Sequence, residues 1–104
     1  METLHFRFEN GKRAIAPQPQ LVGVVSSGNL EVLIEPAPLG GACEIEVNTA
    51  AIGFKKIWQA VMEDFHARWL LADTHIAIND MGATPAVVRL RLDQAVENVM
   101  GGTS

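Results

Sequence analysis

Two adjacent hydroxyl side chains, Ser26 and Ser27, are the leading candidates for a functional group in this sequence, because they stand directly before Gly28-Asn29. Glycine followed by asparagine is typical of a type II′ hairpin turn, since glycine adopts the positive φ that a side chain resists. A turn at this place pairs Ser27 with Leu30 and Ser26 with Glu31. A hydroxyl at the rim of a rigid hairpin is a suitable attachment point for a larger group, although serine and glycine are also ordinary turn residues.

One cysteine and three histidines are the next candidates. His5, His66 and His75 fall on three different expected elements and lack the spacing of a metal site, so we predict no metal. Cys43 has no cysteine or histidine close to it in sequence and is predicted to be a small buried hydrophobe. A nucleophilic pair of Cys43 with His66 or His75 stays open as an alternative.

The remaining polar motifs do not assemble an active site by themselves. Gly40-Gly41 and Gly82 are not followed by the Gly-Lys-Ser/Thr of a phosphate-binding loop, and Asp80 and Gly82 are expected to shape a turn. Arg89 and Arg91 are predicted on the outward side of a helix, where they either face solvent or contact phosphates or an acidic patch on a partner. The scattered acidic residues place no pair for acid–base catalysis.

Composition narrows the class of protein. The chain has 104 residues, of which 48% are hydrophobic and 19% are charged, and these values favour one globular domain covering 1–104 with a loose tail at 101–104. The net charge of −4 argues against a nucleic-acid partner. No apolar run approaches the roughly 18 residues of a membrane span. A single cysteine fits a reducing cytoplasm, so we expect a cytoplasmic domain.

Periodicity predicts the elements that must position these side chains. Alternating apolar residues, or short Val/Leu/Ile-rich runs, predict strands at 4–8, 21–26, 30–35, 42–48 and 75–79. Segment 11–20, which contains two prolines, is predicted to be a loop. Apolar residues at three- and four-residue spacing predict a helix over 54–69 with the stripe Phe54, Ile57, Trp58, Val61, Met62, Phe65 and Trp69 packed on the sheet.

A second helix is predicted after Pro85, with Thr84 as its N-cap and Gly101-Gly102 as its stop. Its buried stripe is expected at Val88, Leu92, Ala95, Val96 and Val99. The order ββββαβα predicts an α+β fold: a two-layer sandwich of a mainly antiparallel sheet with both helices on one face. We expect 21–26, 30–35 and 42–48 to form a meander of three adjacent strands, with the N-terminal strand at an edge.

Two longer stretches carry a resemblance to a known family. They are residues 22–33, Val-Gly-Val-Val-Ser-Ser-Gly-Asn-Leu-Glu-Val-Leu (the hairpin block), and residues 79–92, Asn-Asp-Met-Gly-Ala-Thr-Pro-Ala-Val-Val-Arg-Leu-Arg-Leu (the turn–helix block). With the length and order of elements, they resemble the acyl carrier protein (delta) subunit of bacterial malonate decarboxylase, and more distantly the gamma subunit of citrate lyase. The resemblance covers nearly the whole chain.

This resemblance implies a non-catalytic carrier. In that family a hairpin serine is linked by a phosphodiester to phosphoribosyl-dephospho-CoA, whose terminal thiol carries an acetyl or malonyl group. The implied partners are the acyl (malonyl) transferase and decarboxylase subunits and the prosthetic-group transferase that attaches the arm. The cofactor supplies the thioester chemistry, and the protein supplies docking and orientation.

The implied attachment residue is Ser27, directly before Gly28. The family form is Gly-Ser-Gly-Asp, whereas this chain has Ser26 in the first place and Asn29 in the last, so Ser26 is the alternative. Two other functions remain open: an unmodified structural or regulatory subunit of a multienzyme complex, and a small thiol enzyme that uses Cys43.

Overall fold

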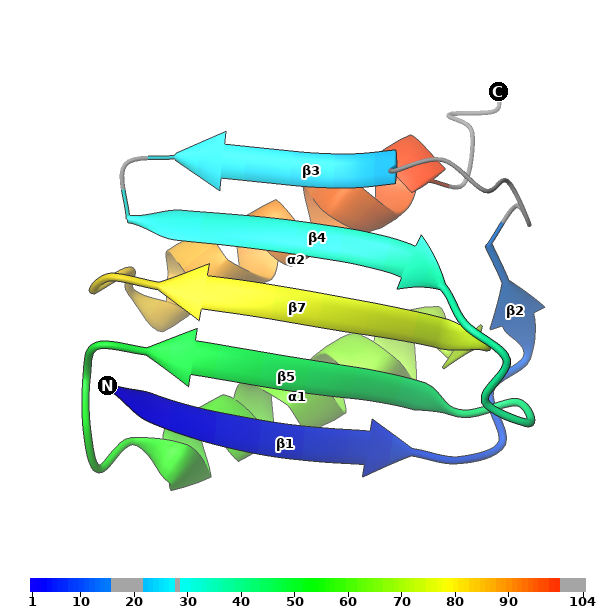
Figure 1. Cartoon of the computed structure of the whole chain (residues 1–104), viewed down its shortest axis with the longest axis horizontal. Helices are drawn as coiled ribbons and strands as arrows, with labels where there is room; N and C mark the ends of the chain where they lie inside the picture. The colour runs from blue at the N-terminus through cyan, green and yellow to red at the C-terminus, as the bar shows by residue number, and fades with distance from the viewer. Residues whose placement is uncertain (16–21, 28, 100–104) are drawn as a thin grey trace.

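A computed structural model describes residues 1–15, 22–27 and 29–99, and for 22–27 it describes the backbone. The elements, in chain order, are β1 (Glu2–Phe8), β2 (Arg13–Ala14), β3 (Val22–Ser27), β4 (Leu30–Pro36), β5 (Cys43–Thr49), α1 (Lys55–Trp69), β6 (Leu71–Ala72), β7 (Thr74–Asp80) and α2 (Pro85–Val99). The main sheet has five strands, and both helices lie behind one face of it (Figure 1). The predicted two-layer α+β fold is confirmed.

The order of strands in the main sheet is β1-β5-β7-β4-β3. The N-terminal strand lies at an edge, as predicted, but the three-strand meander was wrong, because β7 inserts between β4 and β5. β7 pairs antiparallel with β4 and parallel with β5. The connection 37–42 needs to cross only two strand spacings, about 10 Å, and a chain of this length can reach roughly 20 Å. A short loop therefore did not require its two strands to be neighbours.

Alternation along the strands divides the sheet into a buried and an open face. The central strand β7 has the burial pattern of a one-sided strand, with Ile76 and Ile78 fully buried under the helices and His75 and Asn79 on the other side. The open face is polar: Arg7 pairs with Glu9 at 2.6 Å and with Glu44. One face of the sheet thus supplies the core, and the other carries charge.

The two helices bury their apolar stripes against the sheet. α1 lies behind β5 and β1, and α2 lies behind β4 and β3 (Figure 1). All five residues predicted for the α2 stripe are buried, and in α1 the buried residues are Trp58, Met62 and Phe65. Full burial of one such side chain contributes about 1.5–3 kcal/mol, so these faces dock the helices firmly.

The predicted loop 11–20 holds a short strand within its described part. Arg13 and Ala14 of β2 pair in parallel with Leu71 and Ala72 of β6. A two-residue strand has no periodicity to read, which is why the sequence did not indicate it. The rest of that loop, the turn residue Gly28 and the tail at 101–104 lie outside the described residues. Neither α1 nor α2, the two helices of the described residues, has the length and apolar composition of a membrane span.

Candidate functional site

The backbone of the β3–β4 hairpin has the predicted register. Ser27 pairs with Leu30 and Ser26 with Glu31 across an antiparallel ladder. The register shifts between Val22 and Val25, which marks an irregularity at the far end of β3 and leaves the serine end regular. β3 is an edge strand, so the serines stand at a corner of the sheet (Figure 1). Attachment of a group to either serine stays a prediction.

The loop between β7 and α2 lies beside this hairpin. The amide N–H of Met81 donates to the carbonyl oxygen of Asn29 at 2.9 Å, and Leu30 is the register partner of Asp80. Both Asn29 and Met81 are exposed. The hairpin block and the turn–helix block, about fifty residues apart in sequence, therefore form one continuous surface at one end of the molecule.

Asp80 organises the turn that follows β7. Its side chain is 2% exposed and accepts hydrogen bonds from three donors: the Thr49 hydroxyl at 2.8 Å, the Ala83 amide at 2.8 Å and the Gly82 amide at 3.2 Å. Gly82 has a φ of +113°, which favours glycine. The predicted turn-shaping role of Asp80 and Gly82 is confirmed.

The start of α2 follows the sequence expectation closely. The Thr84 hydroxyl accepts a hydrogen bond from the amide of Val87 at 3.3 Å, which makes Thr84 the N-cap. Arg89 is exposed and its Nε lies 3.7 Å from the Asp64 carboxylate of α1. Arg91 is partly buried, and its Nη1 donates to Gln94 at 2.9 Å. The outward placement predicted for both arginines therefore holds for Arg89 and is wrong for Arg91, which packs partly along the helix surface.

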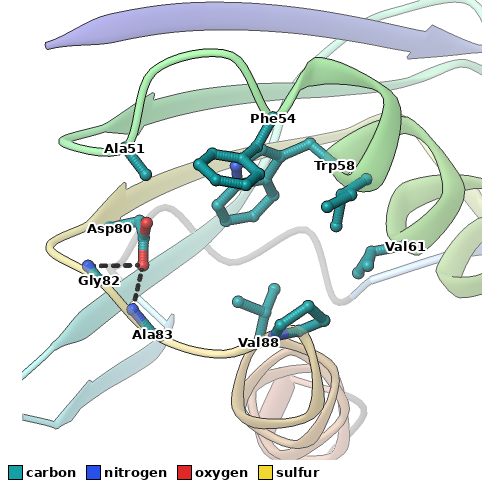
Figure 2. A pocket seen from close by; sticks show the side chains of 10 residues that line it. Ala51, Phe54, Trp58, Val61, Asp80, Gly82, Ala83 and Val88 are labelled. Atoms are coloured by element: carbon teal, nitrogen blue, oxygen red, sulfur yellow. Dashed lines mark hydrogen bonds between the residues drawn. The ribbon is translucent and has the colours of Figure 1, made fainter.

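A pocket of about 210 Å³ opens between the two helices, next to the Asp80 turn (Figure 2). Phe54, which directly precedes α1, and Trp58 of α1 form one wall, and Val88 of α2 forms part of the other. The sequence missed this pocket, because Phe54 and Ile57 were predicted on the sheet-packing stripe. They are instead each 46% exposed and line the pocket.

Other candidate side chains from the sequence lie away from this end or are buried. Cys43 is fully buried, and burial raises the pKa of its thiol to about 12, as expected for an inert structural cysteine. His66 stacks on Phe8 with ring centroids 4.7 Å apart. His5 and His75 share a shallow depression on the open face of the sheet, a proximity that the sequence did not indicate. Among the described residues, no three His, Cys, Asp or Glu side chains are placed to hold a metal.

Comparisons with known proteins agree on one family. The family model described as "Malonate decarboxylase delta subunit (MdcD)" matches residues 17–99. A "Malonate decarboxylase acyl carrier protein" of Xanthomonas campestris pv. campestris (strain B100) is 61% identical over 103 residues, covering 97% of each chain. One of Stenotrophomonas maltophilia (strain R551-3) is 57% identical over 103 residues, covering 98% of this chain and 97% of its own.

The fold is also similar to that of a chain in a solved malonate decarboxylase structure. A chain in the crystal structure of a Pseudomonas malonate decarboxylase hetero-tetramer in complex with malonate superposes with a TM-score of 0.73 and 44% identity, covering 93% of this chain and 97% of that one. Since the family model spans most of the sequence and the identities extend over nearly its whole length, the chain belongs to the malonate decarboxylase delta subunit (acyl carrier protein) family.

Proposed function

We propose that this chain is the acyl carrier subunit of a malonate decarboxylase and that it has no catalytic site of its own. In this proposal Ser27 is the attachment point of a phosphoribosyl-dephospho-CoA arm, with Ser26 as the alternative. The arm supplies a thiol on which acetyl and malonyl groups are carried as thioesters. This chain supplies a rigid base for the arm and a surface that presents it to other polypeptides.

The observation that carries the proposal is the meeting of the hairpin block and the turn–helix block at one end of the molecule. These blocks are joined through the Met81–Asn29 hydrogen bond and the pairing of Leu30 with Asp80. A shared functional surface explains why two distant stretches both resemble one carrier family. The relatives at 61% and 57% identity are themselves called acyl carrier proteins.

The residues present are compatible with a bulky attached group. The serines are on an edge strand, and the neighbouring Asn29 and Met81 side chains are exposed, Met81 to 62%. Among the described residues, β3 has a strand neighbour on one side only, so a phosphodiester at the corner need not displace a neighbouring strand. The buried Cys43 thiol, with its raised pKa, argues against the thiol-enzyme alternative.

The proposal also includes partners. The solved relative was crystallised within a malonate decarboxylase hetero-tetramer. We propose that this chain likewise works with other subunits, namely an acyl transferase and a decarboxylase, and that a separate prosthetic-group transferase loads its arm. A tethered acyl group reaches each partner at a raised effective concentration, because every transfer becomes an encounter within one complex.

Intact-mass measurement tests the proposal and the site. The chain is produced together with its native modifying enzymes, as wild type, Ser27→Ala and Ser26→Ala. We expect one phosphoribosyl-dephospho-CoA on the wild type and on Ser26→Ala, and none on Ser27→Ala. Modification lost only in Ser26→Ala would move the site to Ser26. An unmodified wild type that still supports a fully active complex would favour the structural-subunit alternative.

A further inference from the structure

The pocket between α1 and α2 is a small apolar space at the end of the molecule where the arm is proposed to attach. Its walls come from Phe54, the residue that precedes α1, from Trp58 and Val61 on α1 and from Val88 on α2, and the turn at Asp80 closes one side (Figure 2). We propose that this pocket holds the uncharged acetyl-thioester end of the arm and rejects the malonyl form. This inference rests on the proposed carrier function and adds a binding site to it.

The position of the pocket suits a tethered ligand. Ser27 is paired with Leu30, and Leu30 is paired with Asp80, so the backbone of Ser27 lies two strand spacings, about 10 Å, from a residue of the pocket wall. A pantetheine chain is longer than this separation and can fold back over the Asn29–Met81 contact. The ligand is therefore delivered to the pocket by its own attachment.

The size of the pocket limits the ligand to a short segment. Sites for drug-sized molecules usually exceed about 300 Å³, whereas this pocket has about 210 Å³. An acetyl group, its sulfur and the first carbons of the cysteamine unit are a group of this size. A whole pantetheine or nucleotide is too large.

The chemistry of the lining favours an uncharged group. The walls are mostly aromatic and aliphatic, and two of the lining side chains, Phe54 and Ile57, are each 46% exposed. Covering such a surface with a methyl and a thioester is favourable, since burial of apolar area contributes about 25 cal/mol per Å². The rim would be shielded from water by the remainder of the pantetheine chain.

The Asp80 carboxylate gives the pocket its discrimination. It is buried at the pocket wall, where it accepts hydrogen bonds from the Thr49 hydroxyl and from the Gly82 and Ala83 amides. A malonyl group would bring a second carboxylate toward it without a cation among the lining residues. Like charges several ångströms apart at an effective dielectric near 20 repel by more than the equivalent of a tenfold change in affinity. The malonyl end therefore remains outside, available to a decarboxylase subunit.

The test uses the unmodified, ¹⁵N-labelled full-length chain and two free probes, S-acetylpantetheine and S-malonylpantetheine. We expect S-acetylpantetheine to shift the Trp58 indole N–H and the Gly82 and Ala83 amides, and to bind at least about tenfold tighter than the malonyl probe. Asp80→Asn keeps the shape of the wall and removes its charge. The affinity of the malonyl probe should therefore rise until most of the difference between the two probes is lost.

Two variants fill the pocket from different walls, Ala83→Leu and Ala51→Leu, and each should abolish the shifts at Trp58. Ala67→Leu makes the same change at an exposed position of α1 outside the pocket and should leave them intact. Two pocket variants are used so that a folding defect in one does not decide the result.

Three results would overturn the inference. They are equal affinity for both probes, shifts that persist in both filled variants, and binding of S-acetylpantetheine weaker than about 10 mM. The last value matters because a flexible tether provides an effective concentration in the millimolar range, so weaker binding leaves the pocket empty even with the arm attached. The probes do not require modification, so failure here leaves the mass test of Ser27 unaffected.

Discussion

Replacing Asp80 with alanine should destabilise the fold from the end that carries the hairpin. The carboxylate accepts hydrogen bonds from Thr49, Gly82 and Ala83, and a hydrogen bond to a charged group is worth about 1.5–3 kcal/mol. The full sum is not lost, because Gly82 is exposed and its amide can turn to water. The Thr49 hydroxyl also has a second acceptor, the carbonyl oxygen of Ala51 at 3.4 Å.

We therefore expect the free energy of unfolding to fall by about 2–4 kcal/mol in Asp80→Ala. For a domain of this size, each kcal/mol lowers the midpoint of thermal unfolding by about 4–8 °C, so a fall of at least about 8 °C is expected. Asp80→Asn should cost about 1 kcal/mol, since the amide oxygen can still accept from Gly82 and Ala83 and the Thr49 hydroxyl can accept from the new amide.

Urea denaturation followed by tryptophan fluorescence measures these losses, and native-state hydrogen exchange locates them. The Met81 amide, which bonds Asn29, should exchange faster in Asp80→Ala. Asp73 is the matched control, because its carboxylate accepts from two backbone amides in the 37–42 connection, away from the hairpin tip. Asp73→Ala should destabilise without a selective effect on Met81. A loss below about 0.5 kcal/mol in Asp80→Ala would refute the reasoning.

Three further predictions concern the body of the fold. Gly11→Ala should lower the free energy of unfolding, measured in urea, by at least about 1–3 kcal/mol. The reason is that a Cβ at this position would lie 2.1 Å from the carbonyl oxygen of Leu71. A stability equal to wild type would contradict this close approach of the two backbone segments. Burial raises the pKa of the Cys43 thiol to about 12, so at pH 8 this thiol should react with a thiol reagent only as fast as the protein unfolds. Rapid labelling of the native chain would count against its burial. Asp93→Ala should lower the free energy of unfolding by about 2 kcal/mol, because it removes the acceptor of the Trp69 indole N–H at 2.9 Å, a hydrogen bond that joins the two helices. Urea denaturation measures this loss, with Asp93→Asn as the comparison.

Much of the local structure could be predicted from the sequence because it depends on short-range rules. The two-residue turn set the pairing of Ser27 with Leu30, since a short hairpin loop leaves no other register. The Thr84 cap indicated where α2 begins, and the observed bond to Val87 agrees. Alternation and helical spacing located the main strands and both helices within one or two residues of their observed bounds.

The arrangement of these pieces could not be predicted in the same way. The position of β7 depends on its parallel pairing with β5, which is reached through α1 and has no turn signature. For the same reason, the sequence showed the hairpin block and the turn–helix block but not that they meet. Phe54 and Ile57 line the pocket between the helices and are exposed, and this depends on how α1 and α2 pack together, which the spacing along one helix does not show.

The sequence by itself determined the main strands and both helices, the buried stripe of α2, the hairpin register and the family resemblance, because each depends on residues close together in the chain or on the pattern of a single stretch. Only the tertiary structure decided that β7 separates β4 from β5, that Asn29 bonds Met81, and that Asp80 borders an apolar pocket. These features depend on contacts between distant segments, and their free energy exists only once the sheet and both helices have packed together.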